Sequence, residues 1–238
     1  LFDDCNVRAM LAYFRDGNLH EMKHWFYLSS KARIMWVHET LSPISAEDLL
    51  WVLASDNEEL IAWWRGNRQY YDPPTRPDKK TVVNTDEFAR LQLIRALSQD
   101  WDALAKDCQR ALAQPELFKR GLRPRLGKFQ FWLSLATGDQ DGMRAYLLEL
   151  CAPKQRSRYY QFESGLSNNF IASFATLYAK LAWRAGYELE LDTPWIPKDW
   201  LPVQPLAQYE APWPFMQGFD IWQPFEEPYA ALSPQRPA

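Results

Sequence analysis

Apolar residues recur every three or four positions along this chain, which is the spacing that gathers them on one face of an α-helix. Such stripes run through residues 88–97, 101–112, 143–150 and 170–185, and Gly186 follows the last one as a typical helix C-cap. Strand-like alternation of apolar and polar residues is nearly absent, and only 9 of the 238 residues are glycine. The sequence therefore predicts an all-α fold.

Short polar turns that each carry an aspartate recur between the predicted helices. They are centred on Asp16, Asp56, Asp100 and Asp139, so successive turns lie 40, 44 and 39 residues apart. Each aspartate follows an apolar helix end and is expected to accept hydrogen bonds from the free N–H groups of the next helix. A period near forty with two helices per unit is typical of stacked αα-hairpins, as in tetratricopeptide and HEAT arrays. We therefore predict an irregular array of αα-hairpins, with an ordinary helical bundle as the alternative.

Two proline-rich segments interrupt this rhythm. Residues 65–84 combine prolines with basic residues and are expected to form a long exposed loop. Residues 194–238 hold ten prolines, and aromatic residues are interleaved with them at Trp195, Trp200, Tyr209, Trp213, Phe215, Phe219 and Trp222. Because so many exposed rings would promote aggregation, this tail is expected to pack over the helices. We therefore predict a single helical domain over residues 1–238, in which the tail packs on an αα-array formed by residues 1–193.

The charge of the chain changes sign along its length, although the formal net charge is only −3. The balance of Lys and Arg against Asp and Glu is −5 over residues 1–60, +7 over 61–160 and −5 over 161–238. The basic stretch 119–128 lacks the interleaved aromatic residues of a nucleic-acid site. We interpret it as a solvated segment and expect no direct nucleic-acid binding.

The cysteine and hydropathy patterns favour a soluble cytoplasmic protein. The three cysteines, Cys5, Cys108 and Cys151, form no disulfide framework and no C-x-x-C pair, which favours a reducing compartment. No stretch reaches the ~18 consecutive apolar residues of a membrane span, so no membrane interaction is predicted. The N-terminal residues lack the basic start and apolar run of a signal peptide, although the chain begins at Leu1 rather than Met.

Residues 20–24 read HEMKH, which is the H-E-x-x-H spelling of a zinc-peptidase helix. In that motif two histidines one helical turn apart hold the metal, and the glutamate between them acts as general base. Lys23 argues against zinc, because it would place a cation beside the metal. No H-x-x-G-x-x-H extension supplies the third ligand, which would have to be His38, Glu39 or Glu47.

We therefore interpret this segment as the polar stripe of a surface helix, made of His20, Lys23, His24, Tyr27 and Lys31. A zinc metallopeptidase remains an alternative. The chain has no Gly-rich phosphate loop and no G-x-S-x-G motif. We expect a protein without catalytic residues, cofactor or bound metal.

The segment 181–215, LAWRAGYELELDTPWIPKDWLPVQPLAQYEAPWPF, resembles the C-terminal signature of immunity protein family 49 of bacterial polymorphic-toxin systems. The matching features are a helix that ends at Gly186, the run YELELD, prolines at 194 and 197, the run DWLPVQPL, and Tyr209 followed by Pro212. The upstream helical region fits that family in length and character. A second helical immunity family, paired with nuclease effectors, is similar in class.

The resemblance implies a non-catalytic protein that binds and neutralises a cognate toxin, often one delivered by type VI secretion or contact-dependent systems. The family fixes neither catalytic residues nor toxin contacts by motif. We therefore predict a one-to-one complex in which this protein occludes the active site or substrate groove of the toxin. A tetratricopeptide-like scaffold for another partner is the alternative binding function.

A nuclease toxin would be basic to suit its substrate, so the acidic side of this protein is the predicted docking face. The candidate contacts are the carboxylates Glu47, Asp48, Asp56, Glu58 and Glu59, with Tyr70, Tyr71 and Asp72 of the long loop as anchors. For each single carboxylate, a helix cap or a solvated position is the alternative. The adjacent carboxylates Glu226 and Glu227 fit either a plain surface or a landing place for a basic partner.

Overall fold

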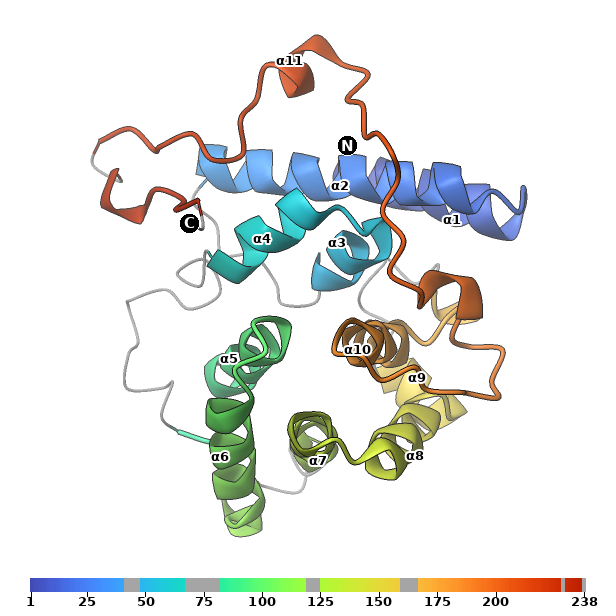
Figure 1. Ribbon diagram of the computed structural model, residues 1–238, viewed down its shortest axis with the longest axis vertical. Coiled ribbons are helices and arrows are strands. Elements are labelled where there is room, and N and C mark those ends of the chain that lie inside the picture. The colour runs from blue at the N-terminus through green and yellow to red at the C-terminus, as the bar shows by residue number, and fades with distance from the viewer. Residues whose placement is uncertain (41–47, 67–81, 119–124, 159–166, 228–229, 237–238) are drawn as a thin grey trace. The chain divides into compact units, whose positions relative to one another are not determined.

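The computed structural model describes residues 1–40, 48–66, 82–118, 125–158, 167–227 and 230–236. All regular elements within these ranges are helices, and the described residues contain no strand (Figure 1). The predicted all-α fold is thereby confirmed. None of the described helices combines the length and the apolar character that crossing a membrane requires.

The contacts divide the chain into two compact units. Unit 1 comprises Leu1–Tyr70 and Lys198–Ala238, and unit 2 comprises Tyr71–Pro197. From the sequence we predict one domain over residues 1–238, with the tail packed on the helices. The division arises because the tail returns to pack on the N-terminal helices, while the middle of the chain builds a core of its own.

Unit 1 begins with a helical hairpin. The hairpin is formed by α1 (Phe2–Phe14) and α2 (Leu19–Thr40), and the other described α-helices of unit 1 are α3 (Leu49–Ser55), α4 (Glu58–Gly66) and the short α11 (Pro214–Gln217) of the tail (Figure 1). Gly17 has a φ of +63°, a left-handed conformation that glycine adopts without strain, and it turns the chain between α1 and α2. The buried residues of α1 include Cys5, Ala9 and Ala12, which are small and let the α2 backbone approach closely.

Unit 2 contains six α-helices in the described residues. They are α5 (Asp86–Leu97), α6 (Trp101–Leu112), α7 (Arg125–Thr137), α8 (Gln140–Leu150), α9 (Pro153–Arg158) and α10 (Ser173–Arg184). The predicted stripes coincide with α5, α6, α8 and α10, although α10 begins at Ser173 rather than at residue 170. Gly186, with a φ of +92°, follows the C-terminus of α10 as predicted. Aromatic rings fill this core, and Phe131 stacks on Tyr178 with centroids 5.1 Å apart.

The predicted aspartate caps are found at only part of the turns. Asp139 accepts a hydrogen bond from the Gly142 N–H at 3.0 Å and caps α8 as expected. Asp100 occupies the N-cap position of α6, but its side chain makes no capping hydrogen bond.

Asparagines cap the other two helices. Asn18 before α2 and Asn57 before α4 each accept from the backbone N–H three residues further on, at 3.0 and 2.9 Å. Asp16 instead pairs with Arg15 at 2.7 Å. Asp56 ends α3 in a left-handed conformation with a φ of +55°, so its side chain points away from the capping position of the next helix. The predicted side-chain cap is therefore wrong for Asp16 and Asp56, and also for Asp100.

The tail within unit 1 packs on helices through its aromatic rings, as the sequence predicts. Trp200 is 1% exposed and meets Tyr13 and Phe26 edge-on, at centroid distances of 5.5 and 5.4 Å. Tyr209 packs against Tyr27 at 5.0 Å. Phe215, another ring expected to anchor the tail, is instead 54% exposed.

The first residues of the predicted tail belong to unit 2. The carbonyl of Trp195 accepts the Ala172 N–H at 2.7 Å, just before α10. The guanidinium of Arg156 lies over the Trp195 ring, 3.2 Å from its centroid. Both units therefore use tail residues in their packing.

Candidate functional site

The HEMKH segment lies in the first turns of α2 and does not form the solvated stripe that the sequence predicts. Lys23 is 2% exposed and Tyr27 is 8% exposed, because the tail covers this side of α2. His20 is exposed and His24 is half-buried. Burial lowers the pKa of His24, and the neighbouring His20 lowers it further. Among the described residues, no three His, Cys, Asp or Glu side chains lie together as a metal-binding group.

Lys23 forms a buried ion pair with Asp56. The distance from Lys23 Nζ to Asp56 Oδ2 is 2.9 Å, and the two side chains are 3% and 0% exposed. The backbone of Gln204 in the tail serves both charges, since its carbonyl accepts from Lys23 at 2.6 Å and its N–H donates to Asp56 at 3.2 Å. Buried charges require such partners. Asp56 is therefore a structural residue and not the surface docking contact that the sequence suggests.

Tyr209 fixes the tail a few residues further along. Its hydroxyl donates to the carbonyl of Ser55 at 2.6 Å and accepts from the Leu206 N–H at 2.9 Å. Burial is the main cause that raises the pKa of Tyr209 to about 12. Because Ser55 directly precedes Asp56, the segment from Gln204 to Tyr209 is held to the turn between α3 and α4.

The other predicted docking residues are found in different settings. Asp48 accepts from Arg33 Nε at 2.9 Å, and this ion pair is largely buried, with side-chain exposures of 21% and 15%. Glu58 and Glu59 are exposed in the first turn of α4, where the helix dipole favours carboxylates. Four of the predicted contacts lie outside the described residues: Glu47, Tyr70, Tyr71 and Asp72.

A cavity of about 590 Å³ lies between the C-terminal half of α2 and the tail of unit 1. Its apolar walls are Met35, Phe219 and Phe225, and His38 lies with its ring centroid 5.1 Å from Phe219 and 4.5 Å from Phe225. Burial lowers the pKa of His38, while the carbonyl of Ile221 opposes that shift. The cavity was not predicted, because its walls are about 180 residues apart in the sequence.

Carboxylates surround this cavity and continue beyond it. We call Glu39, Glu59, Asp220, Glu226 and Glu227 the acidic surface; all five are exposed. Glu39, Glu226 and Glu227 line the cavity. The adjacent pair Glu226 and Glu227 is visible in the sequence. No motif around it indicated that the tail would bring these residues next to α2.

The remaining two carboxylates, Glu59 and Asp220, interact with side chains close to the cavity. Trp222 Nε1 donates to Glu59 at 3.2 Å. Burial lowers the pKa values of His38 and Lys31. The charge of Asp220 partly offsets this lowering for both side chains, and the charge of Glu59 does so for Lys31, so both carboxylates lie near them. The acidic surface is thus a continuous feature of unit 1, built from α2, α4 and the tail.

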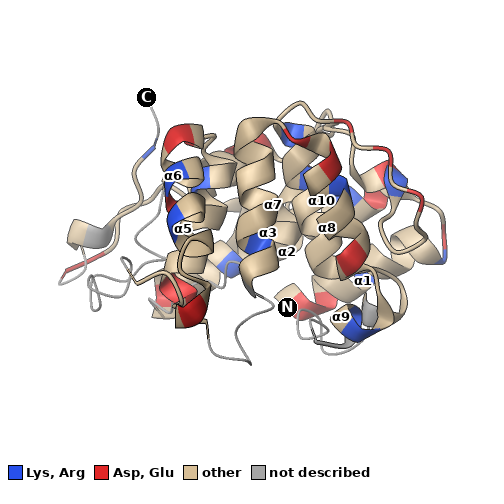
Figure 2. Ribbon diagram, turned by 90° about the horizontal axis from the view of Figure 1, so that it is seen from below, with Lys and Arg blue, Asp and Glu red and all other residues tan. Residues whose placement is uncertain are grey.

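The two units differ in net charge. Unit 1 has 15 Asp or Glu against 9 Lys or Arg, a net charge of −6, whereas unit 2 has 15 against 18, a net charge of +3. Figure 2 shows acidic and basic positions interspersed along α5, α6 and α8 of unit 2. The imbalance toward acid is therefore a property of unit 1, where the cavity lies.

Comparison of the chain with protein-family models, with curated proteins and with solved structures gives no match.

Proposed function

We propose that this protein is a non-catalytic immunity protein that binds a cognate bacterial toxin and neutralises it in a one-to-one complex. The toxin would dock as a basic domain on the acidic surface of unit 1. The observation that supports this most directly is the gathering of five exposed carboxylates from α2, α4 and the tail in a unit of net charge −6.

The segment that resembles the immunity family supports the proposal through its structural role. Gly186 ends α10, and Trp200 lies in the core of unit 1. The backbone of Gln204 serves the buried ion pair, and Tyr209 bonds to the turn before α4. These signature residues fix the tail on the helices of unit 1. The tail then carries Asp220, Glu226 and Glu227 of the acidic surface.

A rigid acidic surface suits a protein that must capture a toxin quickly and hold it. Complementary charge raises the association rate with a basic partner, and a pre-organised surface loses less conformational entropy on binding. Near-complete protection of the producing cell needs nanomolar affinity or better, which corresponds to about −12 kcal/mol. Such complexes usually bury about 1,600 Å² in total, so the interface extends beyond the cavity.

A nuclease is the toxin class that best fits this charge pattern. The substrate groove of a nuclease is basic because it binds phosphates, and an acidic surface competes directly for that groove. Occlusion of the groove requires no chemistry from the immunity protein. The proposed mechanism is therefore steric and electrostatic blockade of substrate binding.

The test is co-expression of this protein with a candidate toxin from a neighbouring gene, together with measurement of complex stoichiometry and binding kinetics. Glu58→Lys with Glu59→Lys should slow association about tenfold at low salt and weaken protection, because the α4 end of the docking face changes sign. Glu188→Lys with Glu190→Lys is the matched control, since these exposed residues of unit 2 undergo the same charge change.

Two outcomes would contradict the proposal. Absence of protection by the wild-type protein against the neighbouring toxin would remove the immunity function and favour a scaffold for another partner. Equal slowing of association by the control pair would show that overall charge, rather than the acidic surface, governs encounter.

A further inference from the structure

The cavity beside His38 is built to contact a flat or elongated side chain. Phe219 and Phe225 border it together with the imidazole of His38, at centroid distances of 5.1 and 4.5 Å from that ring, and Met35 adds a flexible apolar wall. Its volume of about 590 Å³ exceeds what a single water or ion requires. Aromatic faces carry negative electrostatic potential, so they favour a cation over a neutral polar group.

The polar side chains that line the cavity are three carboxylates, the imidazole of His38 and the amide of Gln223. The carboxylates of Glu39, Glu226 and Glu227 are acceptors. His38 Nε2 is buried and has no hydrogen-bond partner among the described residues. In the imidazole tautomer that carries its proton on Nδ1, Nε2 is an acceptor and needs a donor.

The basic side chains nearby do not fill this role. Arg236 lies 3.8 Å from Asp220 and over the ring of Trp222, and neither Arg236 nor Lys31 is among the residues that line the cavity. A buried acceptor without a partner is costly, and a donor from a bound molecule would satisfy it.

We infer that this cavity receives an arginine side chain of the partner protein. A guanidinium has five N–H donors and no acceptor, carries a permanent positive charge, and stacks on aromatic rings. These properties complement the acceptors of Glu39, Glu226, Glu227 and His38 and the rings of Phe219 and Phe225. The inference rests on the proposed function only for the identity of the partner, because a basic toxin would supply the arginine.

The side-chain specificity can be tested on the chain of residues 1–238 without any toxin. Nα-acetyl-arginine amide is titrated into protein labelled at the methionine methyl groups, and the Met35 methyl and the His38 ring are followed by NMR. Saturable shifts of both are expected. The citrulline derivative, which has nearly the same shape but no charge, should bind at least about tenfold more weakly, because it loses the charge-assisted hydrogen bonds.

Variants define the groups responsible. Glu226→Gln with Glu227→Gln should weaken arginine binding about tenfold, whereas Glu188→Gln with Glu190→Gln in unit 2 should leave it unchanged. The substituted residues are exposed, so the thermal unfolding curve should be unaffected in both cases. The Nα-acetyl-lysine amide should bind more weakly than the arginine derivative, since an ammonium group does not stack on the rings.

Several results would overturn the inference. One is the absence of shifts at Met35 and His38 up to the solubility limit of the arginine derivative. The others are binding of the citrulline or the lysine derivative as tightly as the arginine derivative. Failure of the protein to protect against the neighbouring toxin would contradict the proposed function separately, because the arginine titration does not involve the toxin.

Discussion

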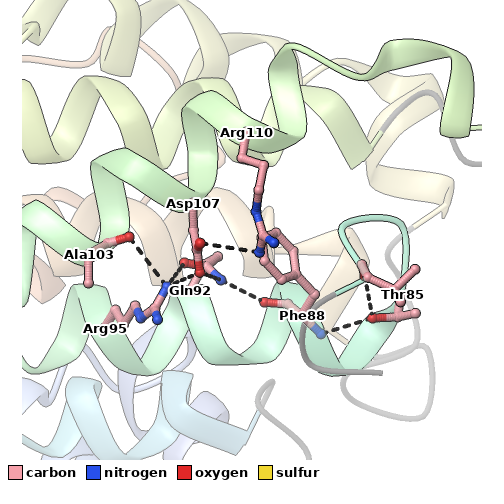
Figure 3. A network of polar contacts seen from close by, with 8 residues as sticks. Thr85, Phe88, Gln92, Arg95, Ala103, Asp107 and Arg110 are labelled. Atoms are coloured by element: carbon pink, nitrogen blue, oxygen red, sulfur yellow. Dashed lines mark hydrogen bonds and ion pairs between the residues drawn. The ribbon is translucent and has the colours of Figure 1, made fainter. Parts of the chain in front are cut away.

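Each unit of this protein holds a carboxylate in a network with basic side chains, and the two networks are built differently. In unit 2, Asp107 of α6 receives Arg95 from α5 and Arg110 from its own helix, the latter at 3.2 Å (Figure 3). Gln92 joins by donating to Asp107 at 3.3 Å and accepting from Arg95 at 3.1 Å. The side chain of Asp107 keeps 16% of its surface exposed, and water can therefore supplement these contacts.

In the unit 1 network both charged side chains are buried. Lys23 belongs to α2 and Asp56 to the turn after α3, and the backbone of Gln204, which is 181 residues from Lys23 and 148 from Asp56, bonds to both. The members of the unit 2 network lie within two neighbouring helices. Similar chemistry therefore serves two purposes. The unit 2 network joins two neighbouring helices, and the unit 1 network fixes a segment that is distant in the sequence.

The largest expected effect comes from breaking the buried pair. Asp56→Ala should destabilise unit 1 by about 3–5 kcal/mol, because it leaves the Lys23 ammonium buried without its counter-charge. Urea unfolding of the full chain, with hydrogen exchange to assign the loss to unit 1, measures this. The double variant Lys23→Met with Asp56→Asn should recover part of the stability, because it removes both charges, while Asn tolerates the left-handed conformation and keeps an acceptor for the Gln204 N–H. A loss below about 1 kcal/mol in the single variant would show that water reaches Lys23.

The corresponding change in unit 2 should have a smaller effect. Asp107→Ala should cost about 1–2 kcal/mol, because Arg95 keeps the side-chain oxygen of Gln92 and the carbonyl of Ala103 as acceptors, and solvent reaches the site. The same urea and hydrogen-exchange measurements apply, with the loss now located in α5 and α6. Equal losses for Asp56→Ala and Asp107→Ala would contradict the distinction between the two networks.

The same contrast explains how much of the fold could be predicted from the sequence. Helices α5, α6 and α8 coincide with their apolar stripes, because their buried faces are set by residues three and four apart. The caps Asn18 and Asn57 were missed because the neighbouring aspartates carry the same capping chemistry. Which of two nearby Asp or Asn residues caps a helix depends on the backbone conformation between the helices, as the left-handed Asp56 illustrates.

The candidate site was predictable only where its residues are exposed in one helix. Glu58 and Glu59 are in the first turn of α4 as expected, and their adjacency is visible in the sequence. The burial of Lys23 could not be inferred, since lysine is rarely fully buried and the segment that covers it is in the tail. The cavity at His38 depends on the same return of the tail, which periodicity and composition do not reveal.

A smaller effect is expected at the second point where the tail is fixed. Tyr209→Phe should cost about 1 kcal/mol, because it removes the hydroxyl that bonds to Ser55 and Leu206 but keeps the ring on Tyr27. Hydrogen exchange of residues around 204–209 should accelerate while α5–α8 stay unchanged. Tyr187→Phe, a half-buried tyrosine of unit 2, is the matched control and should leave those amides protected.

The smallest expected effect is a pH dependence confined to unit 1, which contains all three histidines of the chain. Burial lowers the pKa values of His24 and His38 in the folded protein, so the unfolded chain takes up protons first as the pH falls below about 6.5. Stability contributed by the neutral imidazoles is present above that pH and is lost as the pH falls through the folded pKa values. Between pH 7.5 and 5.5, unit 1 should therefore lose hydrogen-exchange protection while unit 2 does not.

Variants can separate the two histidines from the other groups that face them. The charged and titratable groups that face these histidines are Asp220, Glu39, Glu226 and Glu227 around His38, and His20, Glu210 and Glu21 near His24. His24→Gln with His38→Gln should abolish the pH dependence of unit 1. His20→Gln, at an exposed position of the same helix, should preserve it. A pH dependence that survives in the double variant, or that appears equally in unit 2, would assign it to carboxylates and remove the electrostatic distinction between the two units.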